Sequence, residues 1–448
     1  MSGDHGLLPK NDIFSGSLQL EKNKTAVSFS LDIDTDGKAR IQPIPWSSLG
    51  ASLEFREELD LLKDQPFTKI KPEGRSSSGE FFICFDFLIQ SDAAEVIFEV
   101  NSYELEQSIP EEPGDFVMQF VRPSIRYPIP FTAKMSSGTL AIISTAATEN
   151  HLGFTVFRFF PNKCNESEML NATQFLDFLI QAVGFSQGIN LRTICTDHRT
   201  RGKSYRKYQP VNFKDEYSHV QPIIHHRDLH GFFKTICNCY ESLTGRKKVL
   251  SSSFRSFTSP NIQLTSAFLN AFTLLEYLTS SLLDPEDIVI TNDELFGQLS
   301  NILKSAIKQS KLLTKDQRQK TYSKLRGLQR ESIRNKISKY FQSRSLAMDQ
   351  IISNSLKKII DTRDSLVHMG EAEASDLSPK ELLNYLDIIN EIITRMLLKE
   401  INYQGRYFSH YKFTEVRIFP DCIIDKESPL SDYYATKAQK QREIDRHI

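Results

Sequence analysis

The sequence predicts an α+β protein, in which an antiparallel β-rich domain of sandwich or barrel type precedes an all-α helical bundle. Three observations support this fold class. Short segments of alternating apolar and polar residues fill the first half of the chain, apolar residues recur at helical spacing in the second half, and the composition is globular, with 40% hydrophobic and 25% charged residues. The length of 448 residues corresponds to roughly two or three domains.

The strands come first along the chain. The segment 17–33 alternates apolar and polar residues on both sides of the polar turn Lys22-Asn23-Lys24, as in a β-hairpin. Segments rich in Phe, Ile and Val, bounded by Ser, Gly or Asp, follow at 80–89, 94–100, 115–121, 138–145 and 153–160. Strands at such close spacing are typical of an antiparallel sandwich or barrel. A helix is predicted after them at 172–184, where apolar residues recur at helical spacing.

The second half is predicted to be helical, with helices at 228–243, 264–283, 294–309, 349–368 and 378–398. Ser378 and Glu381 have the spacing of a capping box around Pro379, so the last helix is expected to begin there. The Ser-rich stretch 251–261 predicts a linker. Together these patterns divide the chain into a β-rich domain at 1–225, a helix and Ser-rich linker at 226–260, a helical bundle at 261–402 and a C-terminal extension at 403–448.

Several classes of site and location are disfavoured. The six cysteines show no disulfide framework, the N-terminus lacks the apolar core of a signal peptide, and no apolar run reaches about 18 residues, so we expect a cytoplasmic protein without a membrane partner. The motifs of P-loop nucleotide hydrolysis, zincins and serine hydrolases are absent. Cys237 and Cys239 lie near three histidines, but CxC lacks the usual spacer of a zinc site, so a metal site is the weaker interpretation.

Charge is distributed unevenly, although the net charge is only −1. Residues 76–121 contain ten acidic and no basic side chains, whereas residues 315–344 contain ten basic and two acidic ones. The basic segment could hold RNA phosphates or be a solvated helix face. The acidic segment could cover it at rest, or merely solubilise the outer faces of strands. A second basic stretch, 198–210, interleaves tyrosines with bases and predicts either a base-stacking surface or an exposed loop.

An arginine followed by a histidine after four or five intervening residues occurs three times, as Arg363 with His368, Arg192 with His198, and Arg442 with His447. Only the first pair ends a strongly amphipathic helix inside the predicted bundle. The second pair lies in a stretch with strand character, and the third lies in a polar tail with no apolar face to hold it. The first pair is therefore the candidate site.

Helical geometry limits how this pair could meet. Positions five apart on a continuous helix are separated by about 140°, so Arg363 and His368 would not share a face, whereas Asp364 and His368 would. Gly370 predicts a helix end that could turn His368 back toward Arg363. In the functional interpretation, Arg363 is the cation, His368 carries a proton and Asp364 orients the imidazole. In the alternative, the two charges are solvated and His368 caps the helix C-terminus.

These residue types suit RNA cleavage without a metal ion. The 2′-hydroxyl must lose a proton to attack the adjacent phosphorus, and the departing 5′-oxygen must gain one. A histidine with a pKa of about 6.5 can do either, and an arginine can stabilise charge on the phosphoryl oxygens. A single histidine per chain is not enough to act as base and acid at the same time, whereas a dimer would supply two histidines, one for each role. The nearby candidates for binding the RNA backbone are Arg326, Arg330, Arg334, Lys336 and Lys339.

The segment RDSLVHMG (363–370), set between the helices containing 267–278 and 381–398, resembles the motif of the HEPN superfamily, helical domains of prokaryotic defence ribonucleases. More narrowly, the chain is similar to ApeA-like proteins of abortive phage infection, in which a β-rich domain precedes a HEPN domain. Segment 14–31 resembles their early hairpin. The resemblance implies that Arg363 and His368 are the catalytic pair and that Asp364 is the polar residue after the arginine, a position that is often Asn or His. Glu276 could approach the site from the first bundle helix.

The same resemblance implies a metal-independent endoribonuclease without a cofactor, working as a homodimer or higher homo-oligomer with two motifs facing each other. Its substrate would be RNA, with tRNA as one candidate. The β-rich domain would be a sensor or regulatory domain that responds to infection, with a phage-derived protein as one candidate trigger. The alternative is a non-catalytic HEPN protein that dimerises through its bundle and binds a protein or glycan through its β-rich domain.

Overall fold

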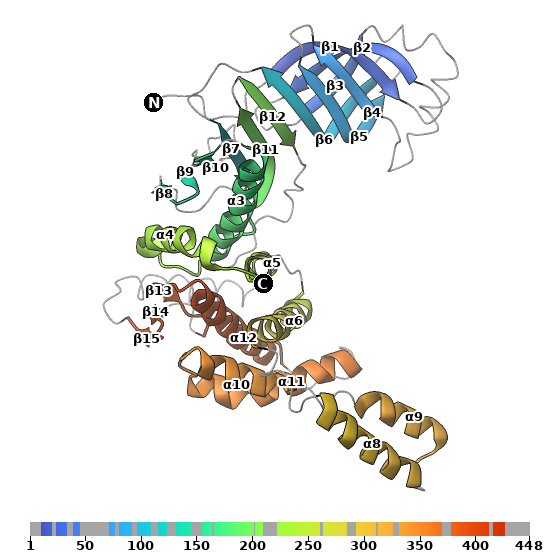
Figure 1. Cartoon of the computed structure of the whole chain (residues 1–448), viewed down its shortest axis with the longest axis vertical. Helices are drawn as coiled ribbons and strands as arrows, with labels where there is room; N and C mark the ends of the chain where they lie inside the picture. The colour runs from blue at the N-terminus through green and yellow to red at the C-terminus, as the bar shows by residue number, and fades with distance from the viewer. Residues whose placement is uncertain are drawn as a thin grey trace. The chain divides into compact units, whose positions relative to one another are not determined.

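The structure is a computed structural model, and it describes residues 10–19, 24–33, 39–44, 71–76, 80–91, 96–108, 115–122, 131–144, 155–163, 165–200, 202–208, 222–259, 263–284, 293–310, 312–325, 331–369, 378–411 and 415–425 (Figure 1). The chain divides into two compact units, residues 1–184 with 189–217, and residues 185–188 with 218–448. The first unit holds a large antiparallel sheet, and the second is mainly helical. The predicted α+β fold class is confirmed.

Six antiparallel strands of the first unit close into a ring. They are β1 (Lys10–Gln19), β2 (Lys24–Ile33), β3 (Ala39–Ile44), β4 (Lys71–Ser76), β5 (Phe81–Ser91) and β6 (Val96–Ser108). The order β3-β2-β1-β4-β5-β6 is closed by pairing of β3 with β6, where Ala39 lies opposite Val100. The predicted hairpin is formed by β1 and β2, with Gln19 opposite Lys24. Closure pairs residues 39–41 of β3 with residues 98–100 of β6, so less strand edge is exposed than in an open sheet.

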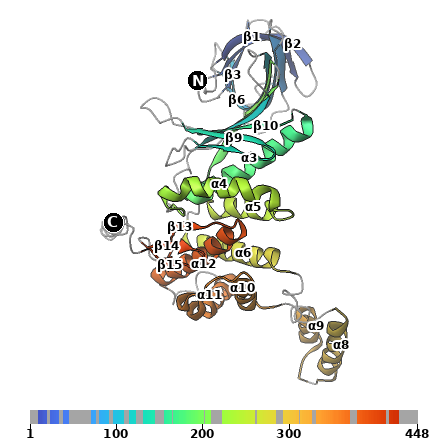
Figure 2. The ribbon, with the colours of Figure 1, turned by 60° about the vertical axis from the view of Figure 1, so that its left-hand side comes forward.

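The sheet continues beyond the ring because β6 is long. Its residues 98–100 pair with β3, and its residues 103–108 pair with β12. The remaining strands follow in the order β12 (Lys203–Tyr208), β11 (Arg192–Thr200), β7 (Phe116–Arg122), β10 (Thr155–Pro161), β9 (Gly138–Ser144) and β8 (Phe131–Lys134). Helix α3 (Glu166–Gln187) lies against this open part of the sheet (Figure 2). Its Phe175 ring contacts the Phe159 ring of β10.

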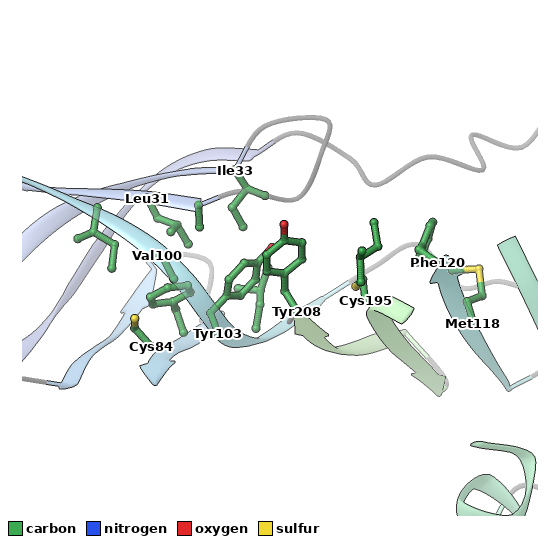
Figure 3. Packing of buried hydrophobic residues seen from close by; sticks show 14 of the residues in the cluster. Leu31, Ile33, Cys84, Val100, Tyr103, Met118, Phe120, Cys195 and Tyr208 are labelled. Carbon is green, nitrogen blue, oxygen red and sulfur yellow. The ribbon is translucent and has the colours of Figure 1, made fainter. Parts of the chain in front are cut away.

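One hydrophobic core runs through both parts of this sheet (Figure 3). Inside the ring Phe82 contacts Phe29 and Tyr103. Tyr103 on β6 stacks on Tyr208 of β12 with ring centroids 5.2 Å apart. Since β6 supplies residues to both sections, its aromatic contacts join them into one apolar layer.

For the basic stretch 198–210, the exposed-loop interpretation is wrong, whereas the base-stacking interpretation stays a prediction for Tyr205, which is exposed by 45%. The described residues of this stretch belong to β11 and β12, because alternate side chains pack into the sheet. Outward-facing Lys203 and Lys207 bind Glu106 and Glu104 of the adjacent β6 at 3.0 and 3.2 Å. Two residues of the acidic segment are thus already paired within the first unit.

A buried charge cluster holds the same hairpin together. Asp197 on β11 is fully buried and accepts hydrogen bonds from Ser204 at 2.6 Å and from Arg199 at 3.1 Å. The guanidinium of Arg206, also buried, lies 3.6 Å from the same carboxylate. These bases therefore neutralise a buried acid rather than face a nucleic acid.

The described helices of the second unit are the short η2 (His226–Asp228) and η3 (Tyr240–Ser242), with α4 (Leu229–Cys239), α5 (Lys247–Phe257), α6 (Leu264–Leu282), α8 (Asp293–Gln309), α9 (Lys315–Lys324), α10 (Ile333–Ser343), α11 (Gln350–Met369) and α12 (Pro379–Glu400). The predicted Ser-rich linker is wrong for residues 251–257. They lie in α5, whose Leu250, Ser253 and Phe254 are buried, so packing of an amphipathic face outweighs the low helix propensity of serine. No described helix is long and apolar enough to cross a membrane.

The segment after residue 402, whose structure the sequence left ambiguous, forms a small antiparallel sheet of β13 (Gly405–Phe408), β14 (Val416–Phe419) and β15 (Ile423–Ile424). Hydrogen bonds connect this small sheet to the start of the helical unit. Asp228 accepts hydrogen bonds from the backbone N–H of Arg406 at 2.7 Å and from its guanidinium at 3.0 Å. The described residues of the C-terminal extension, 403–411 and 415–425, are therefore part of the second unit's packing.

Helix α12 is the centre of the second unit. It begins at the predicted capping box, in which Ser378 and Glu381 bind each other's backbone N–H groups. From Ile388 to Leu398 almost every side chain is buried, and α12 packs on α6 and α11. A helix buried on all sides is expected to be apolar throughout, yet this one carries Glu391 and Arg395.

These two residues are tolerated because their polar atoms are bonded. Arg395 donates from Nε to Glu391 Oε1 at 2.9 Å. Tyr407 donates to the same carboxylate at 2.9 Å, as do Ser409 at 3.1 Å and the backbone N–H of His410 at 2.9 Å. A buried carboxylate with four donors joins α12 to the segment around β13.

Arg395 also reaches the segment that precedes α11. Its Nη1 donates to the carbonyl oxygen of Ala347 at 3.1 Å, and its Nη2 donates to Asp349 at 2.7 Å. Arg417 of β14 donates to the same Asp349 oxygen at 2.7 Å. Burial alone would raise the pKa of Asp349, but the two guanidiniums outweigh it and hold this pKa below its ordinary value.

A second buried carboxylate closes the C-terminal end of α12. Glu400 accepts hydrogen bonds from Arg246 just before α5 at 2.7 Å and from Tyr340 and Arg344 of the α10 segment at 2.8 and 3.3 Å. These contacts tie α5 and α10 to one turn of α12. Both ends of the buried part of α12 are therefore anchored by charge-assisted hydrogen bonds.

We expect Arg395→Met to lower the free energy of unfolding of the helical unit by about 3–5 kcal/mol, because Glu391 would stay buried without its cation. Denaturant unfolding of the full chain, followed by far-UV circular dichroism, measures this. Arg334→Met on the exposed side of α10 is the matched control and should change stability by less than about 0.5 kcal/mol. Equal decreases in the two variants would contradict a structural role for the α12 network.

Candidate active site

The candidate site lies in the C-terminal part of α11, on the face of the helix that packs against the bundle. Ile352, Leu356 and Ile359 form the buried stripe of this helix, at the spacing i, i+4, i+7. Arg363 is the next position of that series. Its side chain therefore leaves α11 on the face that packs against the bundle, but one turn beyond the last buried aliphatic residue.

Two side chains of helix α6 contact the guanidinium of Arg363. The Cζ atom of Arg363 lies 5.6 Å from the centre of the Phe272 ring, which is a cation–π distance. One turn further along α6, Glu276 Oε2 lies 3.7 Å from Arg363 Nη2. Phe272 is itself buried, so the ring gives the guanidinium a fixed support. The spacing of four residues places ring and carboxylate on one face of α6.

Asp364 completes the surroundings of the guanidinium. Arg363 Nη1 donates to Asp364 Oδ1 at 3.0 Å. The side chains remain accessible to water, at 31% for Arg363, 40% for Glu276 and 54% for Asp364. An arginine held by a ring and two carboxylates at a water-exposed position is oriented but not enclosed, so a phosphate could still approach its fork.

The helix end expected at Gly370 agrees with the end of α11 at Met369, but the backbone does not turn position 368 back toward Arg363. Helix α11 continues through position 368 to Met369, because residues up to that point keep helical backbone geometry. Positions 363 and 368 are therefore about 140° apart around one helix, and positions 364 and 368 about 40°. The side chain of His368 lies outside the described part of the structure. Within one chain, Arg363 and His368 do not occupy the same helix face.

The bases predicted to bind RNA have different surroundings. Arg326 and Arg330 lie outside the described residues. Arg334 is exposed on α10, whereas Lys336 donates to Ser280 of α6 at 3.2 Å and Lys339 pairs with Glu331 at 3.2 Å. The basic segment is also divided between α9 and α10 rather than forming one continuous helix. Its charges are therefore partly used for contacts within the chain.

The other arginine–histidine pairs do not form comparable sites among the described residues. Arg192 and His198 both lie on β11, as the strand character of their sequence predicts. The ring of His198 lies 3.4 Å from the hydroxyl of Thr173, and its burial lowers its pKa. Arg442 and His447 lie outside the described residues.

The cysteines near residue 238 have the properties of core residues. Cys237 and Cys239 are buried on α4, and burial raises the pKa of both thiols to about 12. A raised pKa disfavours the thiolate, which is the reactive form of cysteine. Burial also lowers the pKa of His225 to about 4. Across the described residues, no three His, Cys, Asp or Glu side chains are grouped as a metal site would require.

Comparison with known proteins places this site in a family. Residues 269–404 match the family model described as Apea-like HEPN. Residues 269–404 are an Apea-like HEPN domain. The match begins within α6, includes α8 to α12 and ends immediately before β13, so it contains Arg363, Glu276 and Phe272. No curated protein and no solved structure gives a significant match to the chain.

The Apea-like HEPN domain confirms the resemblance that the RDSLVHMG segment indicates. HEPN domains generally have nuclease or defence-type functions, and they commonly dimerise and bind RNA. The contribution of Phe272 was not part of the predicted site, since its place on the apolar stripe of 264–283 indicates only a core residue. The signal that could have revealed it is the spacing of Phe272 and Glu276, which puts an aromatic ring one turn from an acid.

We expect the contacts of Arg363 to add little to stability. In a double-mutant cycle of Arg363→Gln and Glu276→Gln, the coupling free energy should be below about 1 kcal/mol, because both side chains are substantially exposed to water. Denaturant unfolding of the four proteins measures it. A coupling as large as the decrease expected for Arg395→Met would instead identify Arg363 as a structural residue.

Proposed function

We propose that this protein is a metal-independent endoribonuclease of anti-phage defence, acting by abortive infection. The observation that carries the proposal is Arg363, an arginine supported by Phe272 and Glu276 yet open to water, inside an Apea-like HEPN domain. Arg395, whose role is structural, is fully enclosed by its partners. Arg363 instead keeps its guanidinium where a phosphate can reach it.

The chemistry follows from the two residue types. A base removes the proton of the ribose 2′-hydroxyl, whose oxygen forms a new bond to the adjacent phosphorus. The bond from phosphorus to the 5′-oxygen breaks, and that oxygen takes a proton from an acid. A histidine in neutral form serves as base and in protonated form as acid, and we assign these steps to His368. The fork of Arg363 stabilises the charge on the phosphoryl oxygens.

The helix geometry favours a site built from two copies. Because α11 separates positions 363 and 368 by about 140°, one chain is poorly arranged to place both residues on one phosphate. A homodimer in which two α11 helices face each other would bring His368 of one copy toward Arg363 of the other, and would supply the acid and the base together. This arrangement agrees with the common dimerisation of HEPN domains.

The roles of the neighbouring acids also follow from position. We assign Glu276 to positioning Arg363, since it holds Nη2 from the facing helix. Asp364 sits about 40° from position 368, so it can orient the imidazole as well as contact Arg363. Two carboxylates beside one guanidinium also oppose an incoming phosphate, so RNA must compete with them for the fork.

In this proposal the two units have separate tasks. The helical unit cleaves RNA, with tRNA as one candidate substrate, and the β-rich unit is a sensor or regulatory domain. A phage-derived protein is one candidate trigger. The sheet of that unit has a closed section and an open section, and rigid scaffolds of this kind commonly carry recognition surfaces.

A second function has one observation in its favour. Arg363 is already paired with two carboxylates, which is also what a non-catalytic, dimerising HEPN scaffold would show. Its β-rich unit would then bind a protein or glycan. Incubation of the purified full chain with total tRNA in EDTA separates the two functions. Cleavage that survives chelation supports the nuclease, whereas inertness even with an infected-cell extract supports the scaffold.

We expect Arg363→Ala and His368→Ala each to reduce RNA cleavage by at least about a hundredfold while leaving the circular dichroism spectrum unchanged, because each removes a reacting group and leaves the core intact. Cleavage of total tRNA in EDTA is the measurement. Arg192→Ala, which changes an arginine of β11, is the control and should cleave normally. Normal cleavage by either site variant would remove the proposed mechanism.

We expect the basic segment to govern RNA affinity more than chemistry. Replacing Arg326, Arg330 and Arg334 together by Gln should weaken binding and flatten its dependence on salt, by about 0.7 in the logarithmic slope for each phosphate of single-stranded RNA that is no longer neutralised. Titration of labelled RNA at several salt concentrations measures the slope. An unchanged slope would reassign the segment to a solvated face or a protein interface.

A further inference from the structure

A small polar cavity lies in the first unit, between helix α3 and the open part of the sheet. Its volume is about 170 Å³, well above the space that one ordered water needs. Strands β7, β11 and β12 and helix α3 supply its lining, which is mainly polar and includes Gln119, Thr173, Asp177, Thr193, Thr196 and Lys207. All of these residues belong to the first unit, whereas Arg363 lies in the second, so the cavity is separate from the candidate active site.

Strand pairing explains why polar side chains meet here. Thr196 of β11 pairs with Gln119 of β7 on one side and with Lys207 of β12 on the other. Residues that are paired across neighbouring strands point to the same face of a sheet, so these three form a row. A β-bulge between Thr193 and Cys195 adds one residue to β11 beside this row. The cavity lies at this irregularity, since both residues of the bulge also line it.

Gln119 is the buried polar group of the cavity, with only 1% of its surface exposed. Its amide Nε2 donates to Asp177 Oδ1 of α3 at 2.7 Å, which fixes the orientation of the amide because a carboxylate only accepts. The other amide atom, Oε1, accepts no hydrogen bond from any described residue. A buried acceptor without a donor lowers stability, and the cavity is the adjacent space from which a ligand can supply that donor.

Opposite charges lie toward the two ends of the row. Asp177 is exposed beside Gln119, and a carboxylate can accept further hydrogen bonds besides the one from the amide. Lys207 lies two strands away from Gln119, or about 10 Å between backbones. Its ammonium pairs with Glu104 of β6 at 3.2 Å, but the lysine side chain is 54% exposed. Such a surface pair is weak, so a ligand anion can compete for the ammonium.

We propose that this cavity binds a free amino acid in its zwitterionic form. The ammonium group of the ligand donates to Gln119 Oε1 and to the carboxylate of Asp177. The carboxylate of the ligand binds the ammonium of Lys207, and the hydroxyl of Thr196, midway along the row, donates to it. The ligand thereby supplies the donor that the buried amide oxygen lacks, and it places each of its charges beside the opposite charge of the protein.

Other classes of small ligand fit the lining less well. A simple anion would lie near the carboxylate of Asp177, and a simple cation would lie near the ammonium of Lys207. A nucleobase is commonly held by stacking on an aromatic ring, and no aromatic side chain is among the described residues that line the cavity. A zwitterion is the class that satisfies both charges and the buried amide together.

Thermal unfolding of the full chain with each standard amino acid at millimolar concentration tests the proposal. We expect at least one of them to raise Tm, because a ligand that binds only the folded chain stabilises it. Isothermal titration then measures its affinity and that of its carboxamide and N-acetyl derivatives. Each derivative lacks one charge and should bind at least about tenfold more weakly. No shift with any amino acid, a shift with nucleosides alone, or equal binding of the derivatives would overturn the proposal.

Gln119→Leu tests the buried amide. We expect it to weaken amino-acid binding at least about tenfold and to leave Tm of the ligand-free protein unchanged or higher, because it removes a buried acceptor that has no donor. Gln107→Leu, which changes a buried glutamine of β6, is the control and should bind as the wild type does. A lower ligand-free Tm with wild-type affinity in Gln119→Leu would make this glutamine structural and refute the proposal.

Lys207→Met tests the anionic end of the ligand, and β12 offers a closely matched control. Lys203 lies on the same strand, is 56% exposed and pairs with Glu106 at 3.0 Å. We expect Lys207→Met to weaken amino-acid binding about tenfold and to abolish the preference over the carboxamide, whereas Lys203→Met should change neither. Equal effects of the two substitutions would overturn the assignment. Since no measurement here uses RNA, a negative result leaves the nuclease proposal untouched.

Discussion

The arrangement of the helical unit depends on one buried ion pair, Glu391 with Arg395, on a helix that is enclosed almost all round. Such a pair is stable only if every remaining polar atom is bonded, since an unpaired charge in the interior is costly. Its partners come from segments far apart in the chain, the loop before α11 and the strands after α12. The ion pair thus holds together α12, the loop before α11 and the strands after α12.

The candidate site depends on this network through the start of α11. Asp349, bound by Arg395 and Arg417, is the residue immediately before α11. Fixing that end sets the rotation of the helix and hence the direction of its stripe from Ile352 to Ile359. Arg363 continues the stripe, so its meeting with Phe272 and Glu276 on α6 follows from contacts made at the start of the helix.

Three arginines of this unit differ in how far their partners enclose the guanidinium. Arg395 is fully enclosed, and its guanidinium is saturated by carboxylates and a carbonyl oxygen. Arg344 is partly exposed and closes the end of α12 through Glu400. Arg363 has acidic partners that themselves face water, so its contacts orient the guanidinium at small energetic cost to the fold. Of these three, Arg363 is the one that we propose to exchange its partners for a ligand.

The sequence by itself determined that a strand-rich part precedes a helical part and that α12 begins at a capping box, because alternation, helical periodicity and capping are local patterns. The HEPN motif was identified by resemblance. The sequence did not determine that Ser251–Phe257 are helical, that the tyrosines of 198–210 lie on a strand with Tyr208 in the core, or that the acids of 76–121 meet lysines of β12. It placed Arg363 and Glu276 together only by resemblance. These features depend on which segments pack together, since burial outweighs local propensity and charges pair across strands and helices rather than along the chain.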